Sequence, residues 1–252
     1  MEYFKVIDPQ GHNGLVYQEG LNVDPIPFNP SGSCKLGGIY FTDAEHIFEF
    51  YGYGEDVYEV EPVGEVYQDP EGNKWKAPAV KLKYIGEIFD LAVVKYLVEQ
   101  QGANIHVRRD YFLRFAAAQG HLEVVKYLVE QGADIHTWND EAFRGAAENG
   151  HLEVVKYLAE QGANIHTYDD CAFRWAAENG HLEVVKYLVE QGADIHTEND
   201  EALRFAAENG HLEVVKYLAE QGVNIHAWND EALRMAELRG QTEVVEYLES
   251  LE

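Results

Sequence analysis

The chain repeats one stretch without change, and this repetition limits its fold more than any other feature. The stretch GHLEVVKYL begins at Gly120 and returns at Gly150, Gly180 and Gly210, an interval of 30 residues. A chain with a fixed period of this length builds a row of similar supersecondary units, each of which buries its apolar face only against its neighbours. A long surface made of copies favours binding over catalysis, because an active site is usually assembled once.

Within each copy the pattern predicts a short extended piece, then two helices joined by a glycine turn. Asp140 precedes the first helix of one copy, and an aspartate recurs there in the others, where its carboxylate is expected to cap free backbone N–H groups. Gly150 is expected to end that helix, because glycine adopts the left-handed conformation of a helix C-terminus without a steric penalty. The second helix is amphipathic, with an apolar face formed by Leu152, Val155 and Leu158.

Five helix pairs follow one unpaired second helix, which lies in the segment DLAVVKYLVEQGANIH. The array is therefore predicted to span residues 87–252 and to open with half a repeat. Its last helix, in QTEVVEYLESLE, carries Glu246 in place of the usual lysine and is expected to form a C-terminal cap. Residues 1–86 are expected to form a separate domain that caps the first, unpaired helix.

Residues 1–86 do not repeat, and their short β-branched or aromatic runs, broken by glycine, proline and asparagine, predict strands. These runs are EYFKVI, GLVYQ, GIYFT, VYEVEP, GEVYQ and AVKLKYI. The turn residues of DPEGNKW favour a hairpin between GEVYQ and the strand that follows. DAEHIFEFYGYG is expected to form a short helix capped by Asp43. The predicted fold class is mostly α, a solenoid of helix-turn-helix units preceded by a small β-rich α+β domain.

The repeated text GHLEVVKYLVEQGADIH resembles the second helix and outgoing turn of an ankyrin repeat, and it is especially similar to ankyrin-repeat proteins of giant, mimivirus-like amoeba viruses. Ankyrin repeats usually run about 33 residues with a T-P-L-H-x-A signature. Here the period is shorter, and EAFRGA or EALRFA occupies the place of that signature. The resemblance implies a noncatalytic protein-protein interaction scaffold with shortened β-turn fingers, and in viral ankyrin proteins such arrays often redirect host proteins.

Arginine and histidine recur in columns along the array. The arginines are Arg114, Arg144, Arg174, Arg204 and Arg234. Because Asp140, Arg144 and Glu148 are four residues apart, we expect salt bridges within or between repeats, and an arginine ladder that binds phosphate or carboxylate is the alternative. The histidines are His121, His151, His181 and His211 in one column and His106, His136, His166, His196 and His226 in the other. Members of one column are a repeat apart, too far to share a metal, so we predict turn and cap hydrogen bonds and no metal site.

Sequence variation gathers just after each Ile-His pair, where ankyrin proteins begin the loop that carries much of the concave binding surface. Exposed tryptophan and tyrosine are enriched among interface hot spots. The predicted partner-binding residues at this loop edge are Trp138, Tyr168, Trp228, Arg108, Glu198 and Tyr111. The alternative is that each aromatic ring only packs on the next turn. The residues that follow the arginine column are expected to fill the core instead: Phe115, Trp175, Phe205 and Met235.

Charge and composition restrict the partners. The formal net charge of −26 repels phosphate backbones and anionic lipid surfaces, so we expect neither nucleic acid nor membrane as a partner, and a protein with a basic patch, such as a host protein, fits better. Cys34 and Cys171 are isolated, and no signal segment or membrane span is recognisable. These features favour an intracellular, cytoplasmic monomer that needs no cofactor.

Two other function classes stay open at this point. GGIYFTDAEHIFEFYG followed by VYEVEP is faintly similar to ADP-ribosyltransferases, in which Glu59 and Glu61 would match the acidic E-x-E pair and His12 would position the substrate. The spacing and the text around His12 depart from that family. The third class is a self-associating structural or virion protein, whose array stacks on itself.

Overall fold

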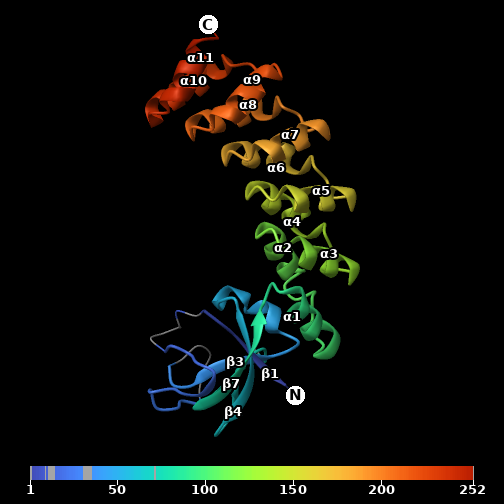
Figure 1. Cartoon of the computed structure of the whole chain (residues 1–252), viewed down its shortest axis with the longest axis vertical. Helices are drawn as coiled ribbons and strands as arrows, with labels where there is room; N and C mark the ends of the chain where they lie inside the picture. The colour runs from blue at the N-terminus through green and yellow to red at the C-terminus, as the bar shows by residue number, and fades with distance from the viewer. Residues whose placement is uncertain (1, 9, 11–14, 31–35, 71, 252) are drawn as a thin grey trace. The chain divides into compact units, whose positions relative to one another are not determined.

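The computed structural model describes residues 2–8, 10, 15–30, 36–70 and 72–251. It forms two compact units, shown in Figure 1. Unit 1 contains Met1–Phe112 and Glu130–Ala133, and unit 2 contains Leu113–Val129 and Asp134–Glu252. Unit 1 therefore extends past residue 86, the predicted domain boundary, and includes the unpaired half repeat.

Unit 1 is built on a seven-stranded sheet with the strand order β2-β7-β4-β1-β3-β6-β5. Every neighbouring pair is antiparallel. The strands are β1 (Tyr3–Ile7), β2 (Gly20–Val23), β3 (Ile39–Asp43), β4 (Asp56–Val63), β5 (Tyr67–Gln68), β6 (Trp75–Ala77) and β7 (Ala79–Glu87). A buried cluster from these strands includes Ile39, Phe41, Trp75 and Leu82. The predicted β-rich domain is thus confirmed, together with the hairpin in which Tyr67 faces Lys76.

Two local predictions in unit 1 were wrong. GLVYQ does not form a regular strand, because the Asn22 side chain both accepts a hydrogen bond from the backbone N–H of Gln18 (3.0 Å) and donates one to its carbonyl (2.7 Å). The strand β2 begins only at Gly20. DAEHIFEFYGYG forms two short 3-10 turns, η1 (Ile47–Glu49) and η2 (Tyr51–Tyr53), instead of a helix. The Asp43 carboxylate still accepts the backbone N–H of His46, at 3.1 Å.

The unpaired half repeat packs inside unit 1. It consists of α1 (Leu91–Lys95) and the π-helical turn η3 (Tyr96–Gln100). Phe112, the last residue of the main segment of unit 1, stacks on Phe48 with ring centroids 4.2 Å apart and on Phe89 at 5.3 Å. Phe48 and Phe112 are both fully buried. The non-repeating segment therefore supplies, through Phe48, apolar surface against which Phe112 packs.

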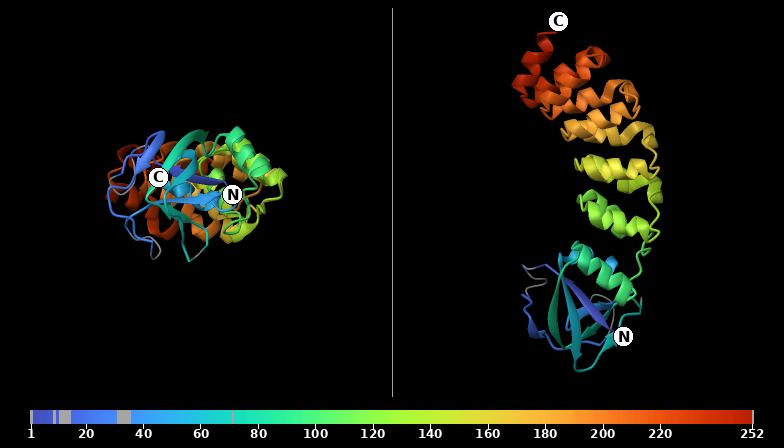
Figure 2. Two further views of the ribbon diagram at one scale, coloured as in Figure 1. Left: turned by 90° about the horizontal axis from the view of Figure 1, so that it is seen from below. Right: turned by 45° about the vertical axis from the view of Figure 1, so that its right-hand side comes forward.

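From Tyr111 onward the chain forms helix pairs, which Figure 2 shows as successive layers. The first helices are α2 (Tyr111–Ala118), α4 (Thr137–Glu148), α6 (Thr167–Glu178), α8 (Thr197–Glu208) and α10 (Ala227–Arg239). The second helices are α3 (Leu122–Glu130), α5 (Leu152–Glu160), α7 (Leu182–Glu190), α9 (Leu212–Glu220) and α11 (Thr242–Glu249). From α4 onward each first helix packs on the next first helix, and each second helix on the next second helix. The predicted helix-turn-helix solenoid is confirmed.

The glycine turn between the two helices also fixes the distance between repeats. Gly150 has a φ of +78°, and a Cβ at this position would lie 2.5 Å from Nδ1 of His181 in the next repeat. Glycine is therefore required at this position for two reasons: the backbone is left-handed, and the imidazole ring approaches too closely for a Cβ atom. Gly120 and Gly180 meet the histidine of the following repeat in the same way.

Candidate functional site

Three consecutive residues at the start of each first helix adopt the left-handed conformation, although none is glycine. In the second helix pair they are Trp138, Asn139 and Asp140, with φ of 53°, 55° and 57°. The same triplet occurs at residues 108–110, 168–170, 198–200 and 228–230. The prediction of an extended piece at this place is therefore wrong. Left-handed backbone costs about 1–2 kcal/mol per residue for most side chains and less for asparagine and aspartate, which fill much of the second and third positions.

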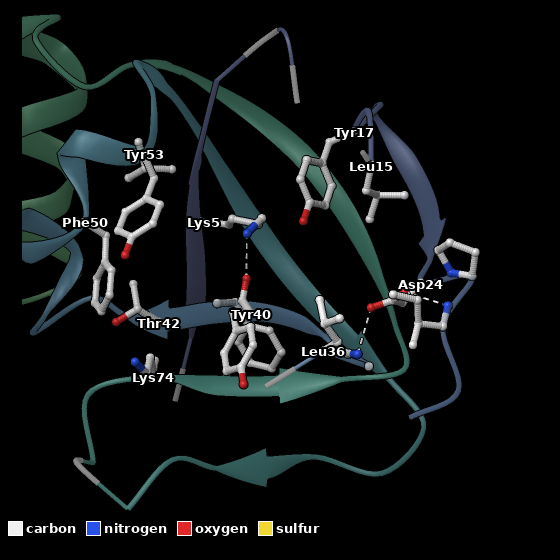
Figure 3. Close-up of a pocket in the computed structure, with 16 residues that line it drawn as sticks. Lys5, Leu15, Tyr17, Asp24, Leu36, Tyr40, Thr42, Phe50, Tyr53 and Lys74 are labelled. Carbon is white, nitrogen blue, oxygen red and sulfur yellow. Dashed lines mark hydrogen bonds between the residues drawn. The ribbon is translucent and has the colours of Figure 1, made fainter. Parts of the chain in front are cut away.

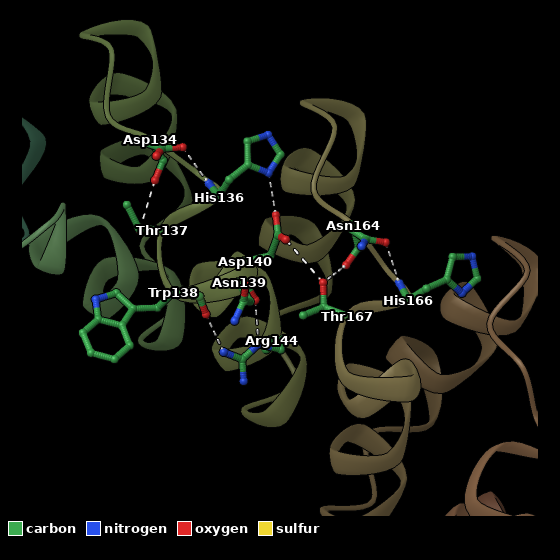
Figure 4. Close-up of polar contacts among 10 residues, drawn as sticks. All are labelled: Asp134, His136, Thr137, Trp138, Asn139, Asp140, Arg144, Asn164, His166 and Thr167. Carbon is green, nitrogen blue, oxygen red and sulfur yellow. Dashed lines mark hydrogen bonds and ion pairs between the residues drawn. The ribbon is translucent and has the colours of Figure 1, made fainter.

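Side chains on both sides hold this left-handed turn in place (Figure 4). Nδ1 of His136 lies 2.8 Å from Oδ1 of Asp140, so an imidazole-carboxylate contact spans the turn. Nε of Arg144 donates to the carbonyl of Asn139 at 2.9 Å, and Nη2 donates to the carbonyl of Trp138 at 2.8 Å. Asp140 was expected to cap helix amides, but its recorded carboxylate partners are side chains. The backbone strain is thus offset by bonds that recur with the repeat.

The turns are also linked from one repeat to the next. Oγ1 of Thr167 donates to the second carboxylate oxygen of Asp140 at 3.3 Å. The side chain of Asn139 donates to the Tyr168 hydroxyl at 2.5 Å. The Arg144 guanidinium lies over the Tyr168 ring, 5.0 Å from its centroid. Each turn is therefore positioned by its own repeat and by the neighbouring one.

Four of the six predicted partner-binding residues occupy the first position of a left-handed triplet in unit 2. Trp138, Tyr168 and Trp228 are 59%, 56% and 63% exposed, although large aromatic side chains are usually well buried. Glu198 occupies the same position and is also exposed. In Figure 4 the Trp138 ring points away from the His136 and Asp140 pair. The turn thus presents to solvent a position that varies between repeats.

The other two predicted residues belong to unit 1 and have partners there. Nε of Arg108 lies 3.2 Å from the carboxylate of Glu49 in η1. The Tyr111 ring lies 5.2 Å from the ring of Tyr51, and Tyr111 is half-buried. Arg108 and Tyr111 therefore contact residues of unit 1, although the Arg108 side chain is still 56% exposed.

The arginine column forms ion pairs between repeats, as predicted, but with a partner that spacing within one helix did not indicate. Arg114 binds Glu141 of the next repeat, and Arg174 binds Glu201 in the same way. Arg204 contacts both Glu201, at 2.7 Å, and Glu231, at 3.5 Å. The signal in the sequence was the recurrence of glutamate 27 residues after arginine.

One repeat breaks this series. Cys171 stands where the other repeats carry the glutamate that faces the preceding arginine. Its thiol is buried, and desolvation raises the pKa of the thiol, while the nearby Arg144 guanidinium acts in the opposite direction. Arg144 lies over the Trp175 ring as well, 5.4 Å from its centroid. Aromatic faces and backbone carbonyls therefore surround Arg144 where its counterparts have a carboxylate.

The residues that follow the arginine column were predicted to fill the core, and this prediction was wrong. Phe115, Trp175, Phe205 and Met235 are all half-buried. Arg204, like Arg144, has an aromatic neighbour at this position, and its guanidinium lies 4.5 Å from the centroid of the Phe205 ring. The sequence did not show that these side chains are partly exposed beside the arginines. Helical spacing alone does not distinguish a buried core position from one that packs against an arginine side chain.

The two histidine columns have the structural roles predicted for them. His106, His136, His166, His196 and His226 each place Nδ1 within 2.6–2.8 Å of the aspartate four residues later. In the other column, His151, His181 and His211 each pack on the glycine turn of the preceding repeat. Desolvation by burial lowers the pKa of His181, opposed by a hydrogen bond with the backbone of Glu148.

Glu59 and Glu61, the acidic pair of the ADP-ribosyltransferase alternative, are held in ion pairs with lysines of unit 1. Glu59 accepts hydrogen bonds from Lys83, at 2.9 Å, and from the Tyr96 hydroxyl, at 2.8 Å, and the pKa of Glu59 is lowered chiefly by these bonds. Glu61 pairs with Lys81 at 2.9 Å. The two lysine contacts run between β4 and β7, whereas Tyr96 belongs to η3. His12 and Cys34 lie outside the described residues.

Two further features of the chain bear on a metal site and on a membrane span. One group of side chains suited to metal binding, Asp43, Glu45 and His46, lies within 4.8 Å in the described residues. Nδ1 and the backbone N–H of His46 both bond the same Asp43 oxygen, so the local turn explains this group. In the residues that the structure describes, no helix is both long enough and apolar enough to cross a membrane.

A stack of helix pairs, joined by turns whose first residue differs between repeats, defines a solenoid repeat protein. The comparison with known families identifies the family of the repeat. Segments 87–169, 113–199 and 173–251 each match the family described as "Ankyrin repeats (3 copies)". The chain belongs to the ankyrin-repeat family. Ankyrin repeats generally mediate protein-protein interactions, and the family is typically noncatalytic.

Three relatives from Acanthamoeba polyphaga mimivirus carry the description "Putative ankyrin repeat protein". One is 37% identical over 124 residues, which cover 46% of this chain and 40% of the relative. A second is 31% identical over 136 residues, covering 51% of this chain and 66% of the relative. A third is 36% identical over 127 residues, covering 47% of this chain and 37% of the relative. The match thus spans less than two thirds of each of these relatives, and their similarity to this chain supports the viral type of repeat.

Proposed function

We propose that this chain is a noncatalytic scaffold that binds a partner protein through the exposed first residues of its left-handed turns. The main support for the proposal is that the first residue of each left-handed turn combines a strained backbone with an exposed side chain. The backbone there is strained, it is held by bonds that recur in the repeats, and it presents a variable side chain to solvent. Strained backbone of this kind often marks a functional surface.

The binding surface consists of Trp138, Tyr168, Glu198 and Trp228, and we name it the turn edge. Tryptophan and tyrosine contribute large contact area for little loss of conformational entropy, which is why they dominate interface hot spots. The net charge of −26 favours a partner with a basic patch and speeds its association at low salt. The relatives are viral, which supports a host protein as the partner and the host cytoplasm as the location.

We also propose that residues 1–86 cap the array. Stacking of Phe48 on Phe112 and the Arg108 to Glu49 ion pair support this role, since both join the non-repeating segment to residues at the start of the repeats. In this proposal Arg108 and Tyr111 belong to the cap contact and contribute little to partner binding.

Affinity capture from amoeba lysate, followed by mass spectrometry, tests the turn edge. The intact chain is compared with a triple variant, Trp138→Ala, Tyr168→Ala and Trp228→Ala. The matched control changes three exposed lysines on the second helices, Lys156, Lys186 and Lys216, to alanine. Loss of three hot-spot side chains is expected to weaken partner binding by more than about tenfold, whereas the lysine variant retains the partner.

Equal capture by both variants would place recognition on another surface and refute the role of the turn edge. Sedimentation over a range of concentrations separates the scaffold from a self-associating structural protein. We expect a monomer whose sedimentation coefficient does not change with concentration, and a coefficient that rises with concentration would favour self-association.

A further inference from the structure

Unit 1 contains a pocket that plays no part in the repeat array. Its volume is about 210 Å³, and it is lined by residues from β1, β3, the turns η1 to η2 and the segments around β2. The rings of Tyr17, Tyr40, Phe50 and Tyr53 form much of its wall (Figure 3). An engineered apolar cavity of about 150 Å³ holds a benzene molecule, so this pocket has room for one ring with a small substituent. Drug-sized ligands and dinucleotides need pockets of roughly 300 Å³ or more.

The polar groups of the pocket give it a cationic character. Lys5 on β1 and Lys74 before β6 both line it, and Nζ of Lys74 lies 4.0 Å from the carboxylate of Asp69, which partly balances its charge. Among the described residues that line the pocket, Asp24 is the one acidic residue. Its two carboxylate oxygens accept the backbone N–H groups of Ile26 and Gly38, each at 2.8 Å. The carboxylate is thus engaged by the backbone and forms no recorded ion pair with either lysine.

Lys5 is the central group of the pocket. Its amine donates to the backbone carbonyl of Tyr40 at 2.7 Å and lies 4.8 Å from the centroid of the Tyr17 ring. Figure 3 shows the amine between the Tyr17 and Tyr40 side chains. An ammonium group has three donors, and among the described residues the structure records one hydrogen bond for Lys5. A charged amine with donors to spare in an aromatic pocket is suited to bind an anion.

We propose that this pocket binds a small molecule that carries a carboxylate or phosphate group on a single ring-sized apolar body. The anion bonds the Lys5 amine, and the ring lies among the tyrosine and phenylalanine side chains. Nothing in this site depends on the array, so the proposal stands apart from the partner-binding function.

The titration behaviour of the pocket agrees with its geometry. Desolvation by burial lowers the pKa of Lys5 to about 8. Desolvation, followed by the charge of Asp24, raises the pKa of Tyr17 to about 12. The pocket therefore disfavours isolated charge, and a bound anion would restore the protonated state of the amine. Below pH 8 the amine is protonated and ready to bind an anion, and above pH 8 it increasingly is not.

Fluorine NMR with the whole chain tests the proposal with two probes of the same ring and opposite charge, 4-fluorobenzoate and 4-fluorobenzylamine. At pH 7 the benzoate is expected to bind about tenfold or more tightly than the amine. Lys5→Met, which keeps the length of the side chain, is expected to remove this preference. Lys81→Met is the control, because Lys81 is exposed and pairs with Glu61 on β4. Competition by phenyl phosphate distinguishes a phosphate ligand from a carboxylate ligand.

Equal affinity for the two probes, or benzoate binding that is unchanged in Lys5→Met, would overturn the proposal. Circular dichroism shows whether that variant folds. If it does not, the wild-type chain decides the question through pH, since benzoate affinity should fall as the pH rises above about 8, the pKa of Lys5. Benzoate affinity that stays constant from neutral pH to well above that pKa would also refute the site.

Discussion

Unit 1 and the repeat array bury their apolar residues in different ways. In unit 1 the central strand β1 pairs with β4 and β3, so that Tyr3 faces both Val60 and Asp43 across long stretches of chain. In the array, from the second helix pair onward, each helix packs on its counterpart one repeat away. Unit 1 therefore depends on contacts that are each made once, whereas the array depends on one kind of contact that is made many times. Unit 1 should therefore unfold as a whole, and the array should open locally.

The largest expected effect is that of Phe48→Ala in unit 1. The side chain is fully buried and stacks on Phe112, so its removal should lower the free energy of unfolding of unit 1 by about 3–5 kcal/mol. Urea unfolding measures this loss. Hydrogen exchange should accelerate in β1, β4 and α1 and stay unchanged in α8 and α9. Val66→Ala, at an exposed position, is the control. Equal acceleration in α9 would show that both units unfold together and would remove the contrast.

In the array, Gly150→Ala tests the contact between repeats. The variant is expected to cost about 2 kcal/mol, in part from left-handed backbone and in part from the His181 ring, which the new methyl group would meet at 2.5 Å. Gly162→Ala is a matched control, because Gly162 also has positive φ but nothing lies within 4 Å of its Cβ position. In a His181→Ala background the two glycine variants should cost the same. A difference that persists there would show that the imidazole ring is not the cause.

Cys171→Glu makes the one irregular repeat like the others. The new carboxylate would face Arg144, as Glu141 faces Arg114 and Glu201 faces Arg174. We expect a gain of about 0.5–1 kcal/mol, the usual range for a partly exposed ion pair, seen as a higher urea midpoint. Glu201→Cys should have the opposite sign. If Cys171→Glu lowers the midpoint, burial of the carboxylate outweighs the ion pair, and this place in the array is specialised for a thiol.

The smallest expected effect concerns pH. Because the pKa of His181 is lower in the folded chain than its ordinary value of 6.5, the unfolded chain binds more protons. The contribution of His181 to stability is therefore complete above pH 6.5 and is lost as the pH falls through the folded pKa. His181→Gln copies the glutamine that the array already carries at Gln241. The variant should show a shallower loss of stability between pH 7 and 5, and an unchanged slope would mean that other groups cause it.

The regular part of this protein could be predicted from sequence, because its determinants are local and repeated. The recurrence of Gly150 with Leu152, Val155 and Leu158 is sufficient to place the helices and their apolar faces. The left-handed turns could not be predicted in this way. Asn139 and Asp140 tolerate such backbone, but Trp138 does not favour it, and only the bonds from Arg144 and His136 make it stable.

In unit 1 the strands were largely predictable, but their order and the pocket were not. The order depends on pairings between segments far apart in the chain, such as Gly20 with Leu82. The pocket brings Lys5, Tyr17, Asp24 and Tyr53 together from four separate segments. No short motif marks such a set, since each residue is ordinary in its own segment.

The contact between Gly150 and His181 also bears on how such a gene changes over time. The same glycine and histidine meet at successive contacts between repeats, within identical stretches of sequence. A copying error that adds or removes 30 codons therefore brings together two repeats whose contact surfaces already match. The length of the turn edge can therefore change in one genetic event without a new interface. Point substitutions at the first turn residue can then alter each copy separately. Repetition of the junction thus makes the protein easy to lengthen and easy to diversify.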